Sequence, residues 1–486
     1  SDLRAVVEKY FALYAGKDLE GLMSLWSEKS PDHASFKQSL QLQFAAENYS
    51  FSLPAISRLK LEGERASLRA TVNLTAINLK NNQKREQKMA RNFALVSEGG
   101  KWKVWRSAPA ENDLAEALAK SKTEAERAGL LADEKDLATS ELAVALGNQG
   151  DRFYNQGAYP EALSIYRLEQ SLANQIGAKT GVARALNHIG NVHLQQGDYA
   201  QASESFQASL TMFEALGDKR AVANAMGSIG RVRFSQGDYA QALDSLQTSL
   251  TMSEALDDKP EIARALTGIG LVHFEQGDSA QALERFQKSM AIREALGDNA
   301  GIGATLNNIG RVHYQQGDYA RALELHQKSL AISESRGDKA GIAIALNNIG
   351  IIYRIQGDYA RALEFYRKSL AMSQNSGRKS GIAVALHNIG NVYRLQGDYA
   401  QSFESFQKSL ALREEIGDKA GIASTLSHIG LFYRLQGDYA QALERFQRSL
   451  SLSEALGNKA GIARALISIG RVHNAQGNYA QAIEYY

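Results

Sequence analysis

From about residue 139 to the end of the chain, apolar residues recur at helical spacing in two clusters per 40 residues. In one such unit the apolar positions are Leu186, Ile189, Val192, Ala202, Phe206 and Leu210. Spacings of three and four residues place side chains on one face of an α-helix. Each unit is therefore predicted to be a pair of amphipathic helices.

The string GDYA marks the same point in successive units. It occurs at 197, 237, 317, 357, 397 and 437, with variants at 157, 277 and 477. Gly197 suits the left-handed residue that ends one helix, Asp198 suits the cap of the next, and Gln201 is expected to complete a capping box. Identical turns should give every pair the same angle, and stacking such pairs in series generates a superhelix.

These positions resemble the tetratricopeptide repeat. The spacings of that motif are matched by Leu186, Ile189, Gly190, His193, Ala202 and Phe206. The period of 40 is similar to the longer-helix repeats of kinesin light chains, Pins-type adaptors and many bacterial proteins. The resemblance implies a mainly α protein, a right-handed α-solenoid over residues 139–486 with eight full repeats and a truncated ninth. It also places Gly190 where the paired helices approach most closely.

Residues 1–110 do not follow the repeat. Helical patterns cover 2–15, 18–27 and 32–46, and the period then changes to two over 68–76, with a hairpin turn at Glu98-Gly99-Gly100. This order resembles the nuclear transport factor 2-like (SnoaL-like) α+β cone. Residues 111–138, rich in Ala, Glu and Lys, predict a helical connector. The whole arrangement is similar to bacterial repeat proteins that continue into a CHAT protease domain, which this sequence does not contain.

Composition narrows the classes of partner. The 486 residues include no long apolar run, which argues against a membrane span. Lys and Arg number 55 against 53 Asp and Glu, a balance that argues against nucleic acid as the main partner. The absence of cysteine excludes disulfides, thiolate zinc sites and cysteine nucleophiles. The compartment stays open, with a lean towards export, because Ser1 fits removal of either an initiator Met or a signal peptide.

An enzyme is the weakest of the alternatives. Its candidate residues in the cone are Tyr10, Tyr14, Asp32 and His33, whose spacing matches no catalytic arrangement, and Asp32-His33 reads more simply as a helix start. The chain has no phosphate-binding glycine loop, paired-histidine metal motif or serine elbow. We therefore expect no catalytic residues, no cofactor and no metal.

The concave face of the solenoid offers candidates for recognition, because the first helix of each pair lines it in this family. The candidate groove residues are Asn308, Asn348, Asn388, Arg311, Arg354, Arg394 and Arg434. Arginine forks suit carboxylates, and a row of amides can bond an extended backbone. These residues predict an acidic, extended peptide as ligand. The alternative is that the amides bond between adjacent repeats and that the arginines are solvated surface.

The chain stops inside its ninth helix pair, which leaves the helix over 459–476 half covered. An uncovered repeat face is complementary to the opposite face of another copy, and such heterologous contacts build open assemblies. The self-association candidates are Ile462, Leu466, Ile469, Tyr479 and Ile483. A fragment of a longer protein explains the same ending. The favoured prediction is a noncatalytic protein-protein interaction scaffold that associates head to tail with copies of itself into an oligomer or filament.

Overall fold

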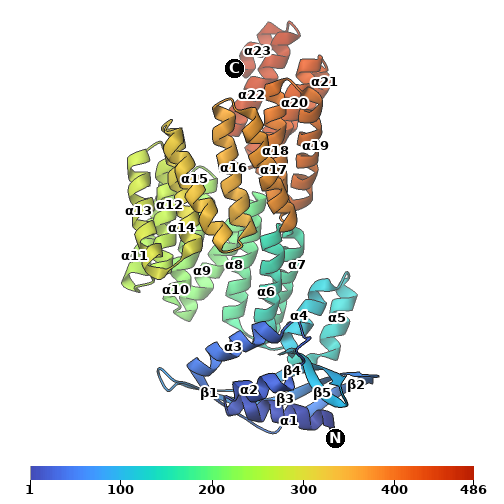
Figure 1. Ribbon diagram of the computed structural model, residues 1–486. Helices are drawn as coiled ribbons and strands as arrows, with labels where there is room; N and C mark the ends of the chain where they lie inside the picture. Colours follow the sequence, from blue (N-terminus) through green and yellow to red (C-terminus); the bar gives the residue numbers. More distant parts are fainter. Residues whose placement is uncertain (1) are drawn as a thin grey trace. The chain divides into compact units, whose positions relative to one another are not determined.

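A computed structural model describes residues 2–486 (Figure 1). The chain forms two compact units, Ser1–Gln149 and Gly150–Tyr486. The first combines helices with one antiparallel sheet, and the second is entirely helical. The predicted fold class, a helical solenoid behind a small α+β domain, is confirmed.

The N-terminal unit places three helices before five strands, as the change of period from helical spacing to two predicted. These elements are α1 (Asp2–Ala15), α2 (Leu19–Leu25), α3 (His33–Ala46), β1 (Glu47–Phe51), β2 (Ala55–Glu62), β3 (Arg65–Asn78), β4 (Lys84–Glu98) and β5 (Lys101–Pro109). The strand order is β1-β3-β4-β5, and β2 shares the β1 side of β3. Because β1 pairs with one end of β3 and β2 with the other, the long β3 strand curls across both.

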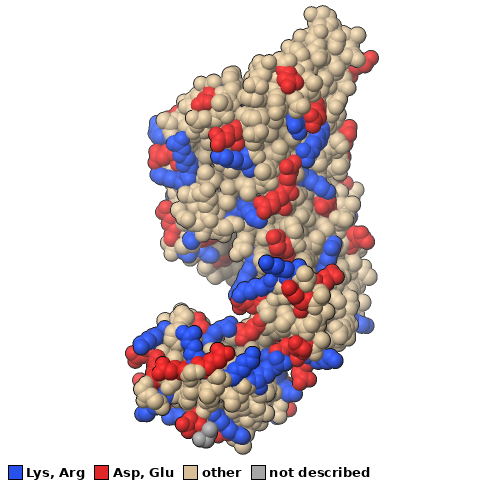
Figure 2. Space-filling view, turned by 90° about the vertical axis from the view of Figure 1, so that its right-hand side faces the viewer, with Lys and Arg blue, Asp and Glu red and all other residues tan. Residues whose placement is uncertain are grey.

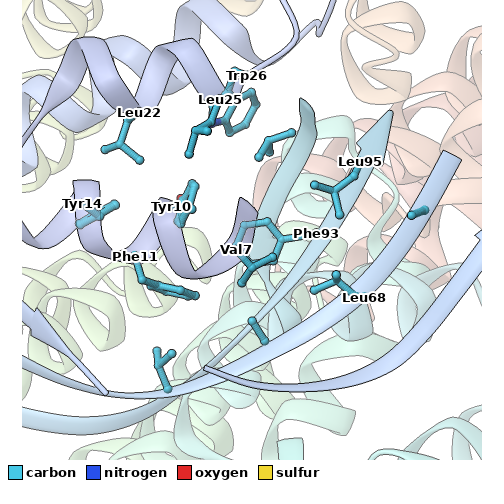
Figure 3. Packing of buried hydrophobic residues seen from close by; sticks show 14 of the residues in the cluster. Val7, Tyr10, Phe11, Tyr14, Leu22, Leu25, Trp26, Leu68, Phe93 and Leu95 are labelled. Carbon is cyan, nitrogen blue, oxygen red and sulfur yellow. The ribbon is translucent and has the colours of Figure 1, made fainter. Parts of the chain in front are cut away.

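Aromatic rings fill the space between the helices and the sheet (Figure 3). The Tyr10 ring lies 5.0 Å from that of Phe93 on β4, and Trp26 stacks on Phe36 at 4.3 Å between centroids. Alternate residues of β3, including Leu68, face this core, because successive strand side chains point to opposite faces. The interior of this domain is therefore packed with side chains.

Between the sheet and the repeats lie α4 (Ala110–Lys120), α5 (Glu124–Asp133) and a single turn, Lys135–Leu137, in the stretch for which the sequence predicts a helical connector. Thr123 and Glu126 cap α5 with a reciprocal capping box. Side chains fasten the connector to the sheet: Arg69 of β3 donates to Glu134 at 2.5 Å, and Asn92 of β4 donates to Asp113 at 2.8 Å.

The second unit continues as antiparallel helix pairs of nearly constant length. Helix α6 (Ser140–Gln156) spans the division between the units. The remaining helices are α7 (Tyr159–Gln175), α8 (Lys179–Gln196), α9 (Tyr199–Leu216), α10 (Lys219–Ser235), α11 (Tyr239–Ala255), α12 (Lys259–Glu275), α13 (Ser279–Leu296), α14 (Asn299–Gln315), α15 (Tyr319–Ser335), α16 (Lys339–Ile355), α17 (Tyr359–Asn375), α18 (Lys379–Gln396), α19 (Tyr399–Ile416), α20 (Lys419–Gln436), α21 (Tyr439–Ala455), α22 (Lys459–Ala475) and α23 (Tyr479–Tyr485).

A glycine on the first helix of each pair receives a large side chain from the second. A β-carbon on Gly190 would lie 2.8 Å from the Phe206 ring, and one on Gly350 would lie 2.7 Å from the Tyr366 ring. Contacts this short require the ring or the helix to shift. The predicted role of Gly190 at the closest helix approach is confirmed.

A second repeated contact joins the helices through a buried serine. The Ser209 hydroxyl donates to the backbone oxygen of Ala183 at 2.8 Å, and the same bond recurs with the same spacing of 26 residues from serines 249, 289, 329, 369, 409 and 449. Each buried hydroxyl is thereby satisfied. These bonds fix how far one helix can slide along the next.

The turns within each pair confirm that a left-handed glycine ends the first helix, but the predicted capping box does not form. Gly197 is left-handed, with φ of 79°, and Asp238 accepts from the backbone N–H of Gln241 as a helix cap should. The expected return bond to the backbone N–H of the aspartate does not form. That N–H is already used, because in each turn it donates to the end of the preceding helix, as Asp198 does to His193 at 2.8 Å.

Successive turns of the superhelix touch each other. Gln196 donates to the backbone oxygen of Ile416 at 3.3 Å across 220 residues, which is five and a half repeats. The Lys419 ammonium pairs with Asp198, and Asp198 makes no cap bond of its own. Ile416 is 1% exposed, packed in a cluster with Tyr159 and Tyr166. In Figure 1 the lower ends of α17–α19 accordingly lie above α7.

Candidate functional site

A hollow of about 880 Å³ in the second unit follows the first helices of the N-terminal repeats. Its lining comes mainly from α6, α8, α10 and α12, and includes Asp151, Tyr154, Tyr166, Arg184, Asn187, His188, Asn191, Arg220, Asn224, Ser228, Arg231, Glu261, Arg264 and Leu271. First helices of adjacent pairs thus form one continuous wall. A volume of this size accommodates several residues of an extended chain.

Glu169 organises one end of this groove. It is completely buried and accepts from Arg184 at 2.9 Å, while its second oxygen lies 3.2 Å from Nδ1 of His188. Every later repeat has a serine at this position, so Glu169 is the one departure from the buried serine series. The His188 ring in turn packs at 4.7 Å from the Tyr166 ring, whose hydroxyl donates to Asp151 at 2.6 Å. Burial, followed by the bond to Asp151, raises the pKa of Tyr166.

Arg231 lies in the middle of the groove and hydrogen-bonds only to neutral oxygens. Its guanidinium donates to Asn191 at 2.9 Å and to Ser228 at 3.0 Å. Asn191 is held in turn by a bond to the backbone oxygen of Asn187 at 3.0 Å. Arg231 is exposed to the groove, and desolvation by the surrounding atoms lowers its pKa.

The neighbouring arginines differ from Arg231 in having acidic partners. Arg264 donates to Glu261 at 2.8 Å, and Arg220 pairs with Asp258 at 2.8 Å. Arg184 is paired with Glu169, as described above. Among these four groove arginines, Arg231 therefore presents the positive charge with no hydrogen-bonded counter-ion, at a place where an incoming carboxylate gains most.

The seven groove candidates taken from the sequence lie outside this cavity, further along the array. Arg311 is stacked over Phe274 at 4.8 Å and reaches Glu275 at 3.5 Å, and Asn388 donates to Asn347 of the preceding repeat at 2.7 Å. Asn308, Asn348, Arg354, Arg394 and Arg434 are half-buried. The Asn388 amide therefore forms a bond between adjacent repeats, which was the alternative to peptide binding.

The self-association candidates divide between core and surface. Ile469 is 1% exposed and packs with Phe446, so it is not available to a partner. Ile462 and Leu466 are half-buried. Tyr479 and Ile483 of α23 are 66% and 74% exposed.

The residues of the enzyme alternative are not gathered into a site. Tyr10 is buried in the aromatic core, and the Tyr14 hydroxyl bonds to Gln43. Asp32 and His33 stand half-buried at the start of α3, where the sequence suggested a helix start. Over residues 2–486 no three metal-binding side chains come together. None of the described helices combines the length and apolarity needed to cross a membrane.

The cavity is lined by the first helices of the pairs, as the predicted recognition stripe is, but in earlier repeats, and the stripe itself stays a prediction. Sequence reasoning missed two repeat positions, those of Arg184 and Asn187, which line the groove six and three residues before Gly190. The signal that could have found them is variation: the Arg184 position reads Asn224 and Arg264 in the next repeats, then Ala304, Ile344, Val384 and Ser424. The first three of these residues, Arg184, Asn224 and Arg264, are all polar and line the cavity.

The geometry of the paired helices defines a class, the helical-repeat binding proteins. Comparison with family models is specific: the tetratricopeptide repeat model matches eight overlapping stretches, from 141–215 to 421–486. The chain belongs to the tetratricopeptide repeat family, whose repeats serve protein-protein interaction.

Other comparisons are more distant. No curated protein matches the chain. Among solved structures, it is similar to a Rap protein complexed with Competence and Sporulation Factor, with 15% identity, 72% of this chain and 96% of that chain covered, and a TM-score of 0.49. It is also similar to the apo quorum sensor NprR from B. thuringiensis, with 14% identity, 69% and 97% coverage and a TM-score of 0.45. BtubC from P. vanneervenii has 18% identity, 45% and 92% coverage and a TM-score of 0.38.

Proposed function

We propose that the protein is a noncatalytic interaction scaffold whose groove over the first repeats holds an extended, acidic peptide segment. The observation that carries the proposal is Arg231, an exposed guanidinium that lines the groove and is bonded to Asn191 and Ser228 and to no carboxylate. A ligand carboxylate at this point forms a charge-assisted, two-pronged contact. Asn187 and Asn224 on the same wall supply amides to the ligand backbone.

The groove is selective because its other charges are already paired. Glu169 holds Arg184 and His188, and Glu261 holds Arg264. These paired groups offer little net attraction to a generally acidic surface, so recognition depends on one well-placed carboxylate. Beyond this segment the same wall becomes apolar, with Ile344 and Val384 49% and 40% exposed. We therefore expect the ligand to carry an acidic residue ahead of or behind an apolar stretch.

The test is selection from a random peptide library displayed in extended form, with the full chain immobilised. We expect enriched peptides to carry Asp or Glu, and Arg231→Glu to lower their affinity by at least about tenfold, the loss of roughly 1.4 kcal/mol or more. Arg321→Glu is the matched control, because Arg321 is exposed on α15 and pairs with Glu324. Enriched peptides without acidic residues, or equal losses in the two variants, would contradict the proposal.

A second candidate is head-to-tail self-association through the face of α22 and α23. Ile467, Tyr479 and Ile483 are all exposed there, and Figure 2 shows few charged side chains over this end of the array. Two apolar repeat faces that meet in this way bury a core-like surface. The test is sedimentation of the full chain against Ile467→Asp with Ile483→Asp. A wild-type chain that stays monomeric at micromolar concentration would exclude this candidate.

For the N-terminal domain we keep the nuclear transport factor 2-like assignment as a proposal, supported by three helices followed by a curled antiparallel sheet. Its aromatic interior, closed around Tyr10 and Trp26, favours a packing role over a small-molecule site. We also keep the expected start of the repeat array at residue 139, supported by α6 beginning at Ser140.

A further inference from the structure

The contact between turns of the superhelix uses one repeat position on each side. On one side are the ends of second helices, Ile416 and Leu456, only 1% and 3% exposed. On the other side are the turns inside earlier pairs, where a β-carbon on Gly197 would lie 2.8 Å from Leu456. We call the first side the lower edge and the second side the upper edge of a turn.

The same residues stand uncovered where no neighbouring turn is present. Leu216 and Leu296 occupy the repeat position of Ile416, yet they are 40% and 43% exposed. Tyr399 occupies the position of Tyr159 and is 46% exposed against 7%. Full burial at these two positions is therefore found where another turn is stacked on them.

Many of the exposed apolar side chains of the second unit lie on the two uncovered edges. Six of its twelve exposed large apolar side chains lie on them: Leu216, Leu296, Ile355, Leu395, Tyr399 and Leu435. At the position of Ile355, Leu395 and Leu435 the earlier repeats have Asn155, Gln195, Ser235, Glu275 and Gln315. The apolar residues thus appear only on repeats whose upper edge carries no turn. Exposed apolar surface concentrated in this way marks an interaction site.

The polar partners of the contact are also repeated. Lys419 pairs with Asp198 within the chain, and the equivalent residues on the free edges are Lys219 and Asp398. Gln196, which donates to the backbone of Ile416, has Gln396 as its equivalent. Asp398 still makes the cap bond, to the N–H of Gln401 at 3.1 Å, that Asp198 has given up for Lys419.

We propose that a second copy of this chain stacks its free lower edge, around Leu216 and Lys219, on the free upper edge around Leu395 and Asp398. The intermolecular contact repeats the one that already joins two turns of a single chain. It is heterologous, because different edges meet, and so each added copy leaves another free edge. It is also distinct from the face of α22 and α23 considered above.

The absence of cysteine from the sequence permits a direct test with single-cysteine variants of the full chain and a short bismaleimide. The Asp198→Cys, Lys419→Cys double variant should cross-link within one chain. A mixture of Asp398→Cys with Lys219→Cys chains should give a cross-linked dimer. Asp398→Cys mixed with Lys368→Cys is the control that should not, because Lys368 is exposed on α17 away from both edges.

Two further variants identify the surface. Leu216→Asp with Leu296→Asp, added to the Lys219→Cys chain, should lower the dimer yield by about tenfold through loss of two apolar contacts. Ile467→Asp with Ile483→Asp should leave it unchanged. Equal yields from the edge pair and the control pair would overturn the proposal, as would a missing cross-link within the chain. A loss confined to the Ile467 and Ile483 variant would instead assign assembly to α22 and α23.

Discussion

The Phe206 ring covers Gly190 so closely that a β-carbon there would lie 2.8 Å from it. We expect Gly190→Ala to lower the free energy of unfolding by about 1–3 kcal/mol, because the ring or the helix must move. Gly303→Ala is the control: its β-carbon would have only ordinary contacts, at 3.6 Å or more, and the other repeats have alanine there. Chemical denaturation should show this second change to be neutral or stabilising by about 0.5–1 kcal/mol.

The contact between turns predicts that equal substitutions at one repeat position have unequal effects. Ile416→Ala should cost about 2–4 kcal/mol, because it empties a buried site next to Tyr159. Leu216→Ala, at the equivalent exposed position, should cost no more than about 0.5 kcal/mol in dilute solution. Urea denaturation of the two variants measures the difference. Similar losses would mean that the turns are not in contact.

A buried histidine predicts a pH dependence of stability. His326 stands where most other repeats have the aromatic residue that faces the glycine. It bonds to Asn307 at 2.8 Å, and burial lowers its pKa to about 4. Below pH 6.5 the unfolded chain binds a proton that the folded chain does not, so stability should fall as pH drops from 6.5 towards 4, by up to about 3 kcal/mol.

His326→Phe should flatten this dependence, and Tyr366→His should steepen it, because Tyr366 faces Gly350 as His326 faces Gly310. Some slope should remain in His326→Phe, since burial also lowers the pKa values of His387 and His428. Denaturation midpoints at pH 7.5 and 4.5 provide the measurement. Identical slopes in all three chains would show that His326 is already protonated when folded.

Glu169 predicts a gain of binding. Glu169→Ser restores the residue found in the other repeats and removes the carboxylate that holds Arg184 and His188. We expect acidic peptides to bind more tightly, by about threefold to tenfold, because Arg184 becomes free to pair with them. Fluorescence anisotropy with an acidic peptide and its amide analogue separates this from a general change. Equal gains for both peptides would argue against a charge effect.

The repeat architecture could be predicted because each of its devices is local. One unit of the sequence is enough to recognise them: a glycine at position 190, a phenylalanine sixteen residues later and a glycine-aspartate turn. The prediction of a capping box was wrong because the backbone N–H of Asp198 already donates to the backbone oxygen of His193. The sequence of one unit does not show that bond.

The groove could be assigned to a helix but not to particular repeats. Nearly identical units leave the ends and the centre of an array alike in sequence, and the position of Arg231 looks no different from that of Arg311. Only the structure shows that Arg311 stacks on Phe274 and bonds to Glu275, while Arg231 is not bonded to a carboxylate. The pairing of Asp198 with Lys419 was equally hidden, because it depends on the pitch of the whole superhelix.

The buried serine bonds have a consequence for how such a protein changes over generations. Ser209 and its six equivalents bond to main-chain oxygens, which every residue possesses, so each unit fits the next whatever side chain stands at the acceptor position. Whole units can therefore be duplicated or deleted in the gene, and the new neighbours still form the serine bond. The number of repeats is the property of this array that is freest to vary.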